Sequence, residues 1–297
     1  MQVLQGLASS GISGNMMIGA LLDLGFPYDV LQQEIEKLHL AGYHFVHRRG
    51  EKLGVEGIYF DVHLHEHPHG YDRISETVLP SSRQVHHSHG HGGHSHARGE
   101  RNYGHKHLTH EHSHGERRSY TEIKQIIEGS DLSKWVKEKS VEAFYRLGMA
   151  EAAVHNSTLE EVHFHEVGAI DCIIDIVGTM IGMEYLGYEA ITFSPLHVGK
   201  GKVNCEHGLM DVPTPATAML LREFPTYTTT VTGELVTPTG ATLVQTLSAD
   251  VSTCRDEAAI KEQVGRMMAL SDSATHKGVG LGTMNLIIPN VFTLFEV

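Results

Sequence analysis

Hydrophobic and polar residues along the chain follow helical spacing in some segments and strand alternation in others. Apolar residues fill 16–24 with helical spacing, Ser13 precedes them at a preferred N-cap position, and Gly25 predicts the end of this helix. A second helix is predicted over 28–38. Residues 58–65 alternate between apolar and polar side chains, which predicts a strand with one buried face.

The polar face of this predicted strand carries Asp61, His63 and His65, because side chains along a strand alternate between its two faces. A carboxylate and two imidazoles side by side are typical metal donors. A solvated strand face explains the same pattern equally well. We therefore treat His63 and His65 as candidate metal ligands.

The second half of the chain continues the mixture of helices and strands. Residues 119–127 have the spacing of a capping box followed by a short helix. A longer helix is predicted to begin at Ser130 or Asp131. Residues 190–203 are predicted to form two strands around a loop.

The fold class follows from the order of these elements. Glycines in 278–282 predict a turn before a final strand over 287–297. Interleaved helices and strands are typical of an α/β protein, with a mixed α+β arrangement as the alternative. We expect one large domain formed by residues 1–66 and 118–297, interrupted by an insertion over 67–117.

Histidine is the unusual component of the composition, at 24 of 297 residues. Fifteen of them lie between His63 and His114, in a segment without an apolar run that could bury itself. We therefore expect residues 67–117 to be a disordered insertion. Neutral imidazoles favour Ni²⁺, Zn²⁺, Cu²⁺ and Co²⁺, so the insertion predicts metal collection, with adventitious binding as the alternative. The candidate ligands within it are His86, His87, His89, His91, His94 and His96.

Charge, cysteine content and hydropathy exclude several classes of protein. Lys and Arg number 23 against 36 Asp and Glu, a net charge of −13 that argues against non-specific nucleic-acid binding. The cysteines Cys172, Cys205 and Cys254 form no C-x-x-C pair, which argues against a disulfide framework or a thiolate zinc site. No apolar run is long enough to cross a bilayer, and no basic leader precedes one. We expect a cytoplasmic protein without a membrane partner.

Residues 163–175 contain the densest group of candidate catalytic side chains. His163, His165 and Glu166 precede a predicted helix that carries Asp171 and Asp175. Those two aspartates are four residues apart, so they share one face of a helix that is otherwise apolar. Two such carboxylates are costly unless they meet a cation or hydrogen-bond donors. We therefore predict fixed metal ligands at the two histidines and catalytic roles for the three acids, with structurally satisfied acids as the alternative.

Three predicted helix starts are candidate anion sites, because the first backbone N–H groups of a helix lack partners inside it. One is the glycine-rich turn at 11–15, and the others are Thr214 and Thr237, each followed by proline at the first helical position. Well-capped helices without a ligand are the alternative. The candidate cofactor-binding residues are Gly11, Ser13, Gly14, Asn15, Thr214 and Thr237.

Taken together, these segments resemble the LarC-type nickel insertion proteins, which make the nickel-pincer nucleotide cofactor of lactate racemase. The resemblance runs in consistent order from about Gln2 to the end of the chain. Its motifs are 10–16, 19–25, the histidine-rich insertion, 118–120, 163–171, 175–178, 194–196, 207–210, 213–218 and 237–241. Family members usually carry an aspartate in the first strand, where this chain has Leu7. They usually also continue into a C-terminal CTP-binding domain, which we expect this chain to lack.

The resemblance implies an enzyme of the cyclometallase or lyase type that inserts Ni²⁺ into pyridinium-3,5-bisthiocarboxylic acid mononucleotide. It implies dependence on CTP with Mg²⁺ or Mn²⁺, and a homo-oligomer in the full-length form. The implied partners are the mononucleotide substrate, a separate C-terminal LarC chain and the lactate racemase apoenzyme.

Under this interpretation, His163, His165, Glu166 and Asp171 hold the metal at the reaction centre. Glu166 is also the candidate general base, because desolvation raises the proton affinity of a carboxylate. The alternative function is a non-catalytic nickel store that delivers metal to a partner chain. A zinc hydrolase is disfavoured, because the chain lacks the H-E-x-x-H spacing there.

Overall fold

The computed structural model describes residues 2–65, 118–164, 169–205, 208–251 and 255–297. In these residues helices and strands interleave around a mixed sheet, which confirms the predicted α/β class. Within the same part of the chain, no helix combines the length and the apolar character that crossing a membrane requires.

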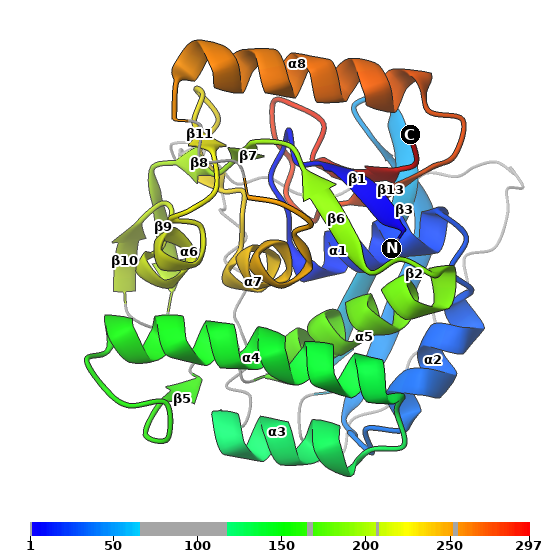
Figure 1. Cartoon of the computed structure of the whole chain (residues 1–297), viewed down its shortest axis with the longest axis vertical. Helices are drawn as coiled ribbons and strands as arrows, with labels where there is room; N and C mark the ends of the chain where they lie inside the picture. Colours follow the sequence, from blue (N-terminus) through cyan, green and yellow to red (C-terminus); the bar gives the residue numbers. More distant parts are fainter. Residues whose placement is uncertain (1, 66–117, 165–168, 206–207, 252–254) are drawn as a thin grey trace, which may run out of the picture. The chain divides into compact units, whose positions relative to one another are not determined.

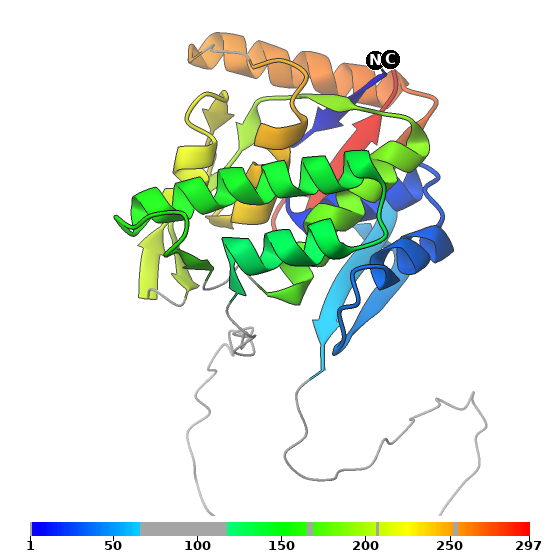
Figure 2. The same ribbon diagram turned by 60° about the horizontal axis from the view of Figure 1, so that its bottom comes forward.

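The central sheet has six strands in the order β2-β3-β13-β14-β1-β6 (Figure 1). Its parallel pairs are β3 with β13 and β1 with β6, and all other neighbours are antiparallel. The strands are β1 (Val3–Leu7), β2 (Tyr43–Lys52), β3 (Val55–Leu64), β6 (Ala190–Phe193), β13 (Lys277–Leu281) and β14 (Val291–Phe295). The start of β1 lies beside the end of β14, so the two ends of the chain are neighbours (Figure 2).

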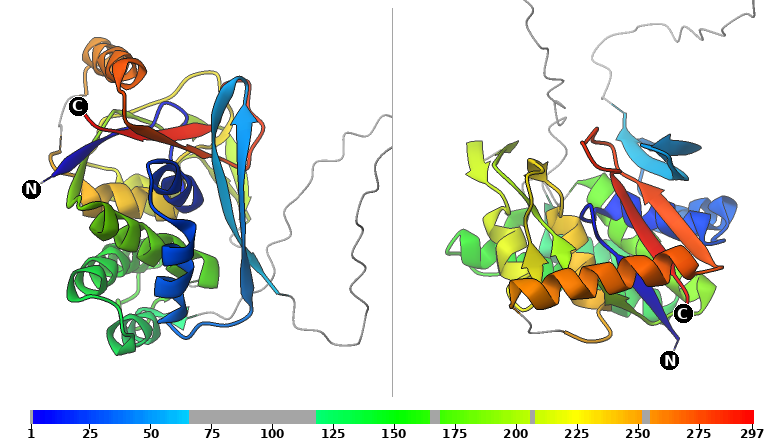
Figure 3. Two further views of the ribbon diagram at one scale, coloured as in Figure 1. Left: turned by 90° about the vertical axis from the view of Figure 1, so that its right-hand side faces the viewer. Right: turned by 90° about the horizontal axis from the view of Figure 1, so that it is seen from above.

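Helices cover both faces of this sheet (Figure 3). α8 packs on one face at β1 and β14, where Leu7, Met267 and Phe295 form a small core. α1 covers the other face and contacts α5 and α7, with α4 and then α3 beyond them. The helices are α1 (Gly14–Asp23), α2 (Tyr28–Glu36), α3 (Tyr120–Gly129), α4 (Lys134–Val154), α5 (Ile170–Leu186), α6 (Pro215–Leu220), α7 (Pro238–Leu247) and α8 (Glu257–Ser273).

Short strand pairs connect the larger elements. β4 pairs antiparallel with β5, so the residues that follow the histidine-rich insertion lie beside the segment that precedes α5. The pairs β7 with β11, β8 with β12 and β9 with β10 lie between β6 and α7 along the chain. These strands are β4 (Arg118–Ser119), β5 (His163–Phe164), β7 (Leu196–His197), β8 (Gly199–Lys200), β9 (Lys202–Cys205), β10 (Gly208–Asp211), β11 (Thr226–Tyr227) and β12 (Gly233–Glu234).

The predicted turn over 278–282 is wrong, because most of these residues belong to β13. A Cβ atom added to Gly278 would lie 2.1 Å from the carbonyl oxygen of Ala20 in α1. One added to Gly280 would lie 1.8 Å from the carbonyl oxygen of Met16. These glycines therefore allow α1 to lie directly on the strand, and they do not reverse the chain.

Small residues also let α1 and α2 approach α5. A Cβ atom on Gly178 would lie 2.9 Å from Ile18, and one on Gly182 would lie 3.0 Å from Leu21. Both glycines continue the helical row that begins at Asp175. The face of α5 that carries the aspartates and these glycines is therefore the face that α1 covers.

Several predicted helix and strand boundaries are confirmed. Ser119 forms a capping box with Glu122 at the start of α3, and the apolar side chains of β3 alternate into the core as expected. The predicted start of α4 is displaced: the helix begins at Lys134, because the hydroxyl of Ser133 accepts the backbone N–H of Val136 at 3.1 Å. The last strand begins at 291 instead of 287.

Candidate functional site

The carboxyl group of Asp175 lies against the first residues of α1. Asp175 is partly buried, and the backbone N–H of Asn15 donates a hydrogen bond to its carboxylate. A Cβ atom added to Gly14 would lie 2.4 Å from Asp175 Oδ2, so only glycine leaves room for this contact. The α1 start, predicted as an anion site, thus receives a carboxyl group from the protein itself.

The surroundings of Asp175 favour its neutral form. Burial raises the pKa of Asp175 well above the ordinary aspartate value, and the nearby carboxylates of Asp171 and Asp61 raise it further, against the opposing hydrogen bond from Asn15. Its Oδ1 atom is buried and has no hydrogen-bond partner among the described residues. Asp175 therefore holds a proton at pH values where exposed aspartates are ionised.

The start of α7 is fixed to the turn that precedes α1. The backbone N–H of Thr237 donates to the carbonyl oxygen of Ile12 at 3.2 Å, and a Cβ atom on Gly240 would lie 2.2 Å from that oxygen. Thr239 Oγ1 lies 3.3 Å from Sγ of Cys172 in the first turn of α5. The N-termini of α1, α5 and α7 therefore meet, and the partial positive charges of all these helix ends favour an anion there.

Cys172 contributes a buried thiol at this meeting point. Burial raises its pKa well above the ordinary cysteine value, the hydrogen bond with Thr239 opposes this, and the carboxylates of Asp171, Asp175 and Glu151 raise it again. The side chain is therefore a neutral thiol at neutral pH, whereas metal ligation uses the thiolate.

The predicted ligands His63 and His65 lie at the end of the β2–β3 hairpin and are exposed. His63 pairs with His44 of β2 in the strand register, and its Nε2 lies 3.3 Å from Asp61 Oδ2. His65 Nε2 lies 3.0 Å from His44 Nδ1. The shared face of Asp61 and the two histidines is thus as predicted, and β2 adds a third imidazole. The prediction missed His44, although it alternates with the apolar Tyr43 and Phe45, which is a strand signal.

The remaining predicted metal ligands and the predicted base lie largely beyond the described residues. Within the described part of the chain, no three His, Cys, Asp or Glu side chains already have an arrangement that could hold a metal ion. His163 belongs to β5, which leads toward α5 through residues 165–168. The candidates outside the described residues are His86, His87, His89, His91, His94, His96, His165 and Glu166.

The other predicted anion-binding residues make internal contacts. The hydroxyl of Thr214 donates to Glu234 Oε1 at 2.9 Å, so a carboxylate of the protein lies at the start of α6. Gly11 has φ +83°, and a Cβ atom there would lie 1.9 Å from the carbonyl oxygen of Leu235. The hydroxyl of Ser13 donates to Asn15 Oδ1 at 2.5 Å. Among the described residues, the α1 start therefore contacts Asp175, and the α7 start contacts Cys172 in the first turn of α5.

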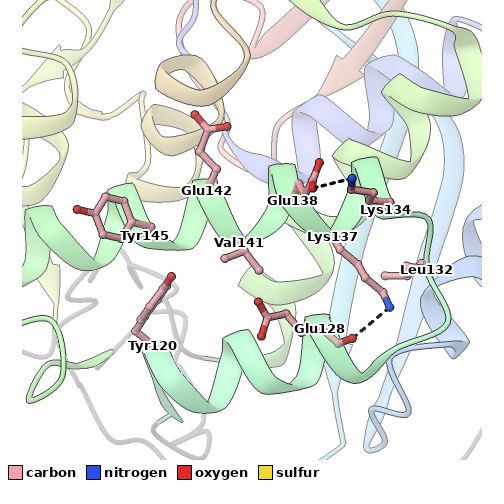
Figure 4. Close-up of a pocket in the computed structure, with 9 residues that line it drawn as sticks. All are labelled: Tyr120, Glu128, Leu132, Lys134, Lys137, Glu138, Val141, Glu142 and Tyr145. Carbon is pink, nitrogen blue, oxygen red and sulfur yellow. Dashed lines mark hydrogen bonds and ion pairs between the residues drawn. The ribbon is translucent and has the colours of Figure 1, made fainter.

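A separate groove of about 700 Å³ lies between α3 and α4 (Figure 4). Two lysines at one end already contact oxygen atoms of the protein: Lys134 Nζ lies 3.7 Å from Glu138 Oε1, and Lys137 Nζ donates to the carbonyl oxygen of Glu128 at 3.1 Å. None of the predicted site residues lines this groove. The meeting point of α1, α5 and α7 therefore remains the candidate site.

Comparison with known proteins decides the family. A family model described as nickel insertion protein matches residues 7–296. The chain belongs to the nickel insertion protein family. The match includes the predicted motifs at 10–16, 163–178 and 237–241.

Curated relatives within this family cover almost the whole chain. A pyridinium-3,5-bisthiocarboxylic acid mononucleotide nickel insertion protein of Desulfitobacterium hafniense is 38% identical over 286 residues, which are 96% of this chain and 56% of the relative. The protein of that name from Clostridium kluyveri is 35% identical over 96% of this chain and 59% of its own length. A putative nickel insertion protein of Geobacter metallireducens is 36% identical over 96% of this chain and 58% of its length. The chain thus spans less than two thirds of these relatives, and no solved structure matches it.

Proposed function

We propose that this chain takes part in the insertion of Ni²⁺ into pyridinium-3,5-bisthiocarboxylic acid mononucleotide, the substrate named for its relatives. The product would be the nickel-pincer nucleotide cofactor of lactate racemase. The observation that carries the proposal is the pair of partly buried acids of α5 at the point where three helix N-termini meet. Family membership supports the handling of nickel, and the site supports an anionic substrate.

The electrostatics of the site suit this substrate, which carries a phosphate and two thiocarboxylates. Helix N-termini stabilise anions, most strongly where several of them converge. The raised pKa of Asp175 favours its protonated form, in which the carboxyl group carries no charge that would repel the substrate. The starts of α1, near Ser13, and α7, near Thr237, are therefore the proposed contacts for the anionic groups, with Thr214 as a further candidate.

The proposed chemistry exchanges one proton for one metal ion. The ring C–H bond breaks, a Ni–C bond forms, and Glu166 accepts the proton, while the thiocarboxylate sulfurs form two Ni–S bonds. His163, His165 and Asp171 hold Ni²⁺ during this exchange, after the imidazoles of the insertion release it. CTP with Mg²⁺ or Mn²⁺ belongs to the proposal through the family resemblance alone, and no described residue is assigned to it.

The direct test is cofactor formation by the purified chain with Ni²⁺, CTP and the mononucleotide, measured by mass spectrometry with and without the C-terminal part of a longer relative. We expect product in at least the supplemented reaction. The Glu166→Gln variant should lose most of the rate, and the matched Glu160→Gln variant should keep it, because Glu160 is exposed. Wild-type rates from a folded Glu166→Gln chain would contradict the assignment of the base.

A second candidate function is a nickel store that delivers metal to a partner chain. The fifteen histidines between His63 and His114 favour it, because so many imidazoles in one segment offer more metal donors than a single catalytic site uses. The two functions differ in what the insertion is needed for.

A further inference from the structure

We propose that His44 and His65 form a two-imidazole transfer site for Ni²⁺ at the end of the β2–β3 hairpin, where the chain enters the histidine-rich insertion. This proposal rests on the proposed function, because it takes nickel to be the metal that the insertion collects. It assigns a role to His44, which lies about 20 residues before the insertion.

The spacing of the two ring nitrogens suits adjacent positions on one metal ion. His65 Nε2 and His44 Nδ1 are 3.0 Å apart. Metal–imidazole bonds of about 2.1 Å that meet at a right angle place the nitrogens about 3.0 Å apart, whereas a tetrahedral angle places them about 3.4 Å apart. Right-angle geometry is that of square-planar and octahedral ions such as Ni²⁺. The metal would replace the hydrogen bond that now joins the rings.

Neighbouring side chains on the same face can complete the coordination of a passing ion. His63 stands opposite His44 in the strand register, with ring centroids 5.3 Å apart, and Asp61 follows on the same face of β3. The side chain of His63 is 50% exposed, so it can turn toward an ion held by the pair. A site with two fixed donors binds weakly and releases readily, as a transfer site requires.

The β2–β3 hairpin also links the start of the insertion to the helices of the candidate site. Only Glu66 separates His65 from the insertion, and Asp61 of β3 lies four residues before His65, about 13 Å along an extended chain. β3 packs against both α1 and α5, whose N-termini form the candidate site. On the opposite face of β2, His47 stacks on Tyr28 at 4.5 Å and takes no part in the site.

Anomalous diffraction from nickel-soaked crystals of the full chain tests the site. We expect a peak at the nickel edge within about 2.1 Å of both nitrogens. His44→Gln should abolish this peak, and the matched His47→Gln should keep it. Nickel that binds elsewhere on the chain without a peak at this pair would overturn the proposal.

Kinetics separate this proposal from the proposed function. With limiting Ni²⁺, His44→Gln should slow cofactor formation at least fivefold, and with excess Ni²⁺ it should match the wild type. Equal rates at limiting nickel would overturn the transfer role. A peak at the pair in a chain that forms no cofactor under any condition would support metal binding here and contradict the proposed function.

Discussion

The side chain of Asp175 occupies the predicted anion site at the start of α1. The glycine-rich turn before α1 has the composition of an anion site, and the structure places a carboxyl group of the protein there, hydrogen-bonded to the N–H of Asn15. Because the surroundings of this group favour its neutral form, the helix end keeps much of its positive potential for a ligand. In its protonated form, Asp175 therefore bonds the N-terminus of α1 without adding a negative charge to the site.

Replacement of Asp175 by Asn should make the protein less sensitive to rising pH. In the unfolded chain the carboxyl group ionises near 3.8, whereas the folded protein retains the proton to higher pH. Above that value the unfolded state binds fewer protons, so the stability of the wild type falls as pH rises until the folded pKa is passed. Asp175→Asn removes this loss and keeps an oxygen for the N–H of Asn15. The melting temperature of Asp175→Asn minus that of the wild type should therefore increase from pH 4 to pH 8, as measured by circular dichroism.

The control for this measurement is Asp131→Asn, because Asp131 is exposed. Its melting temperature should follow that of the wild type at every pH, since surface substitutions change stability by less than about 0.5 kcal/mol. A constant gap between Asp175→Asn and the wild type across the pH range would show that the proton is not held there.

At the scale of elements, the packing of α1 on β13 depends on glycine. Gly280→Ala should lower the free energy of unfolding by about 3 kcal/mol or more, because the added Cβ would lie 1.8 Å from the backbone oxygen of Met16. Gly265→Ala in α8 meets no atom within 4 Å and should stabilise the protein by about 0.5–1 kcal/mol. Urea denaturation of both variants measures the contrast, and a tolerated Gly280→Ala would contradict the close approach of the two elements.

The two Thr-Pro helix starts should respond differently to loss of the hydroxyl. Thr237 Oγ1 accepts the N–H of Gly240 at 3.1 Å, so Thr237→Ala should cost about 1 kcal/mol of unfolding free energy. Thr214 caps no N–H of α6 and bonds Glu234 instead. Thr214→Val, which keeps the shape, should therefore leave Glu234 with one hydrogen bond fewer without uncapping the helix. Equal losses in thermal stability and in helical signal for both variants would contradict this distinction.

The sequence predicted those elements whose signals are local. The cap at Ser119, the alternation of β3 and the acidic row of α5 are readable from neighbouring residues, and the structure confirms each. The prediction of a turn in place of β13 was wrong, because Gly278 and Gly280 make room for the backbone of α1. That helix lies about 260 residues away along the chain, and no local pattern reveals the contact. For the same reason the meeting of three helix starts, and the pairing of His44 with His65, could not be predicted.

At the scale of the whole molecule, removal of residues 67–114 distinguishes the enzyme from the nickel store. If the site at the start of α5 does the chemistry, the shortened chain, joined by a flexible linker, should form cofactor at the wild-type rate with excess Ni²⁺ and more slowly when nickel is limiting. If the chain is a store, the deletion should abolish delivery under both conditions. Mass spectrometry of the product at two nickel concentrations gives the answer, with a linker of scrambled, histidine-free sequence and full length as the control.

The pairing of β1 with β14 brings the chain ends close enough for circular permutation. Gln5 stands opposite Phe295, so the first and last residues could be joined by a short peptide without disturbing the sheet. In a circular permutant opened within residues 66–117, β4 would then be the first element and β3 the last. Such a permutant should fold to the same structure, and it would separate the two flanks of the histidine-rich segment onto opposite chain ends.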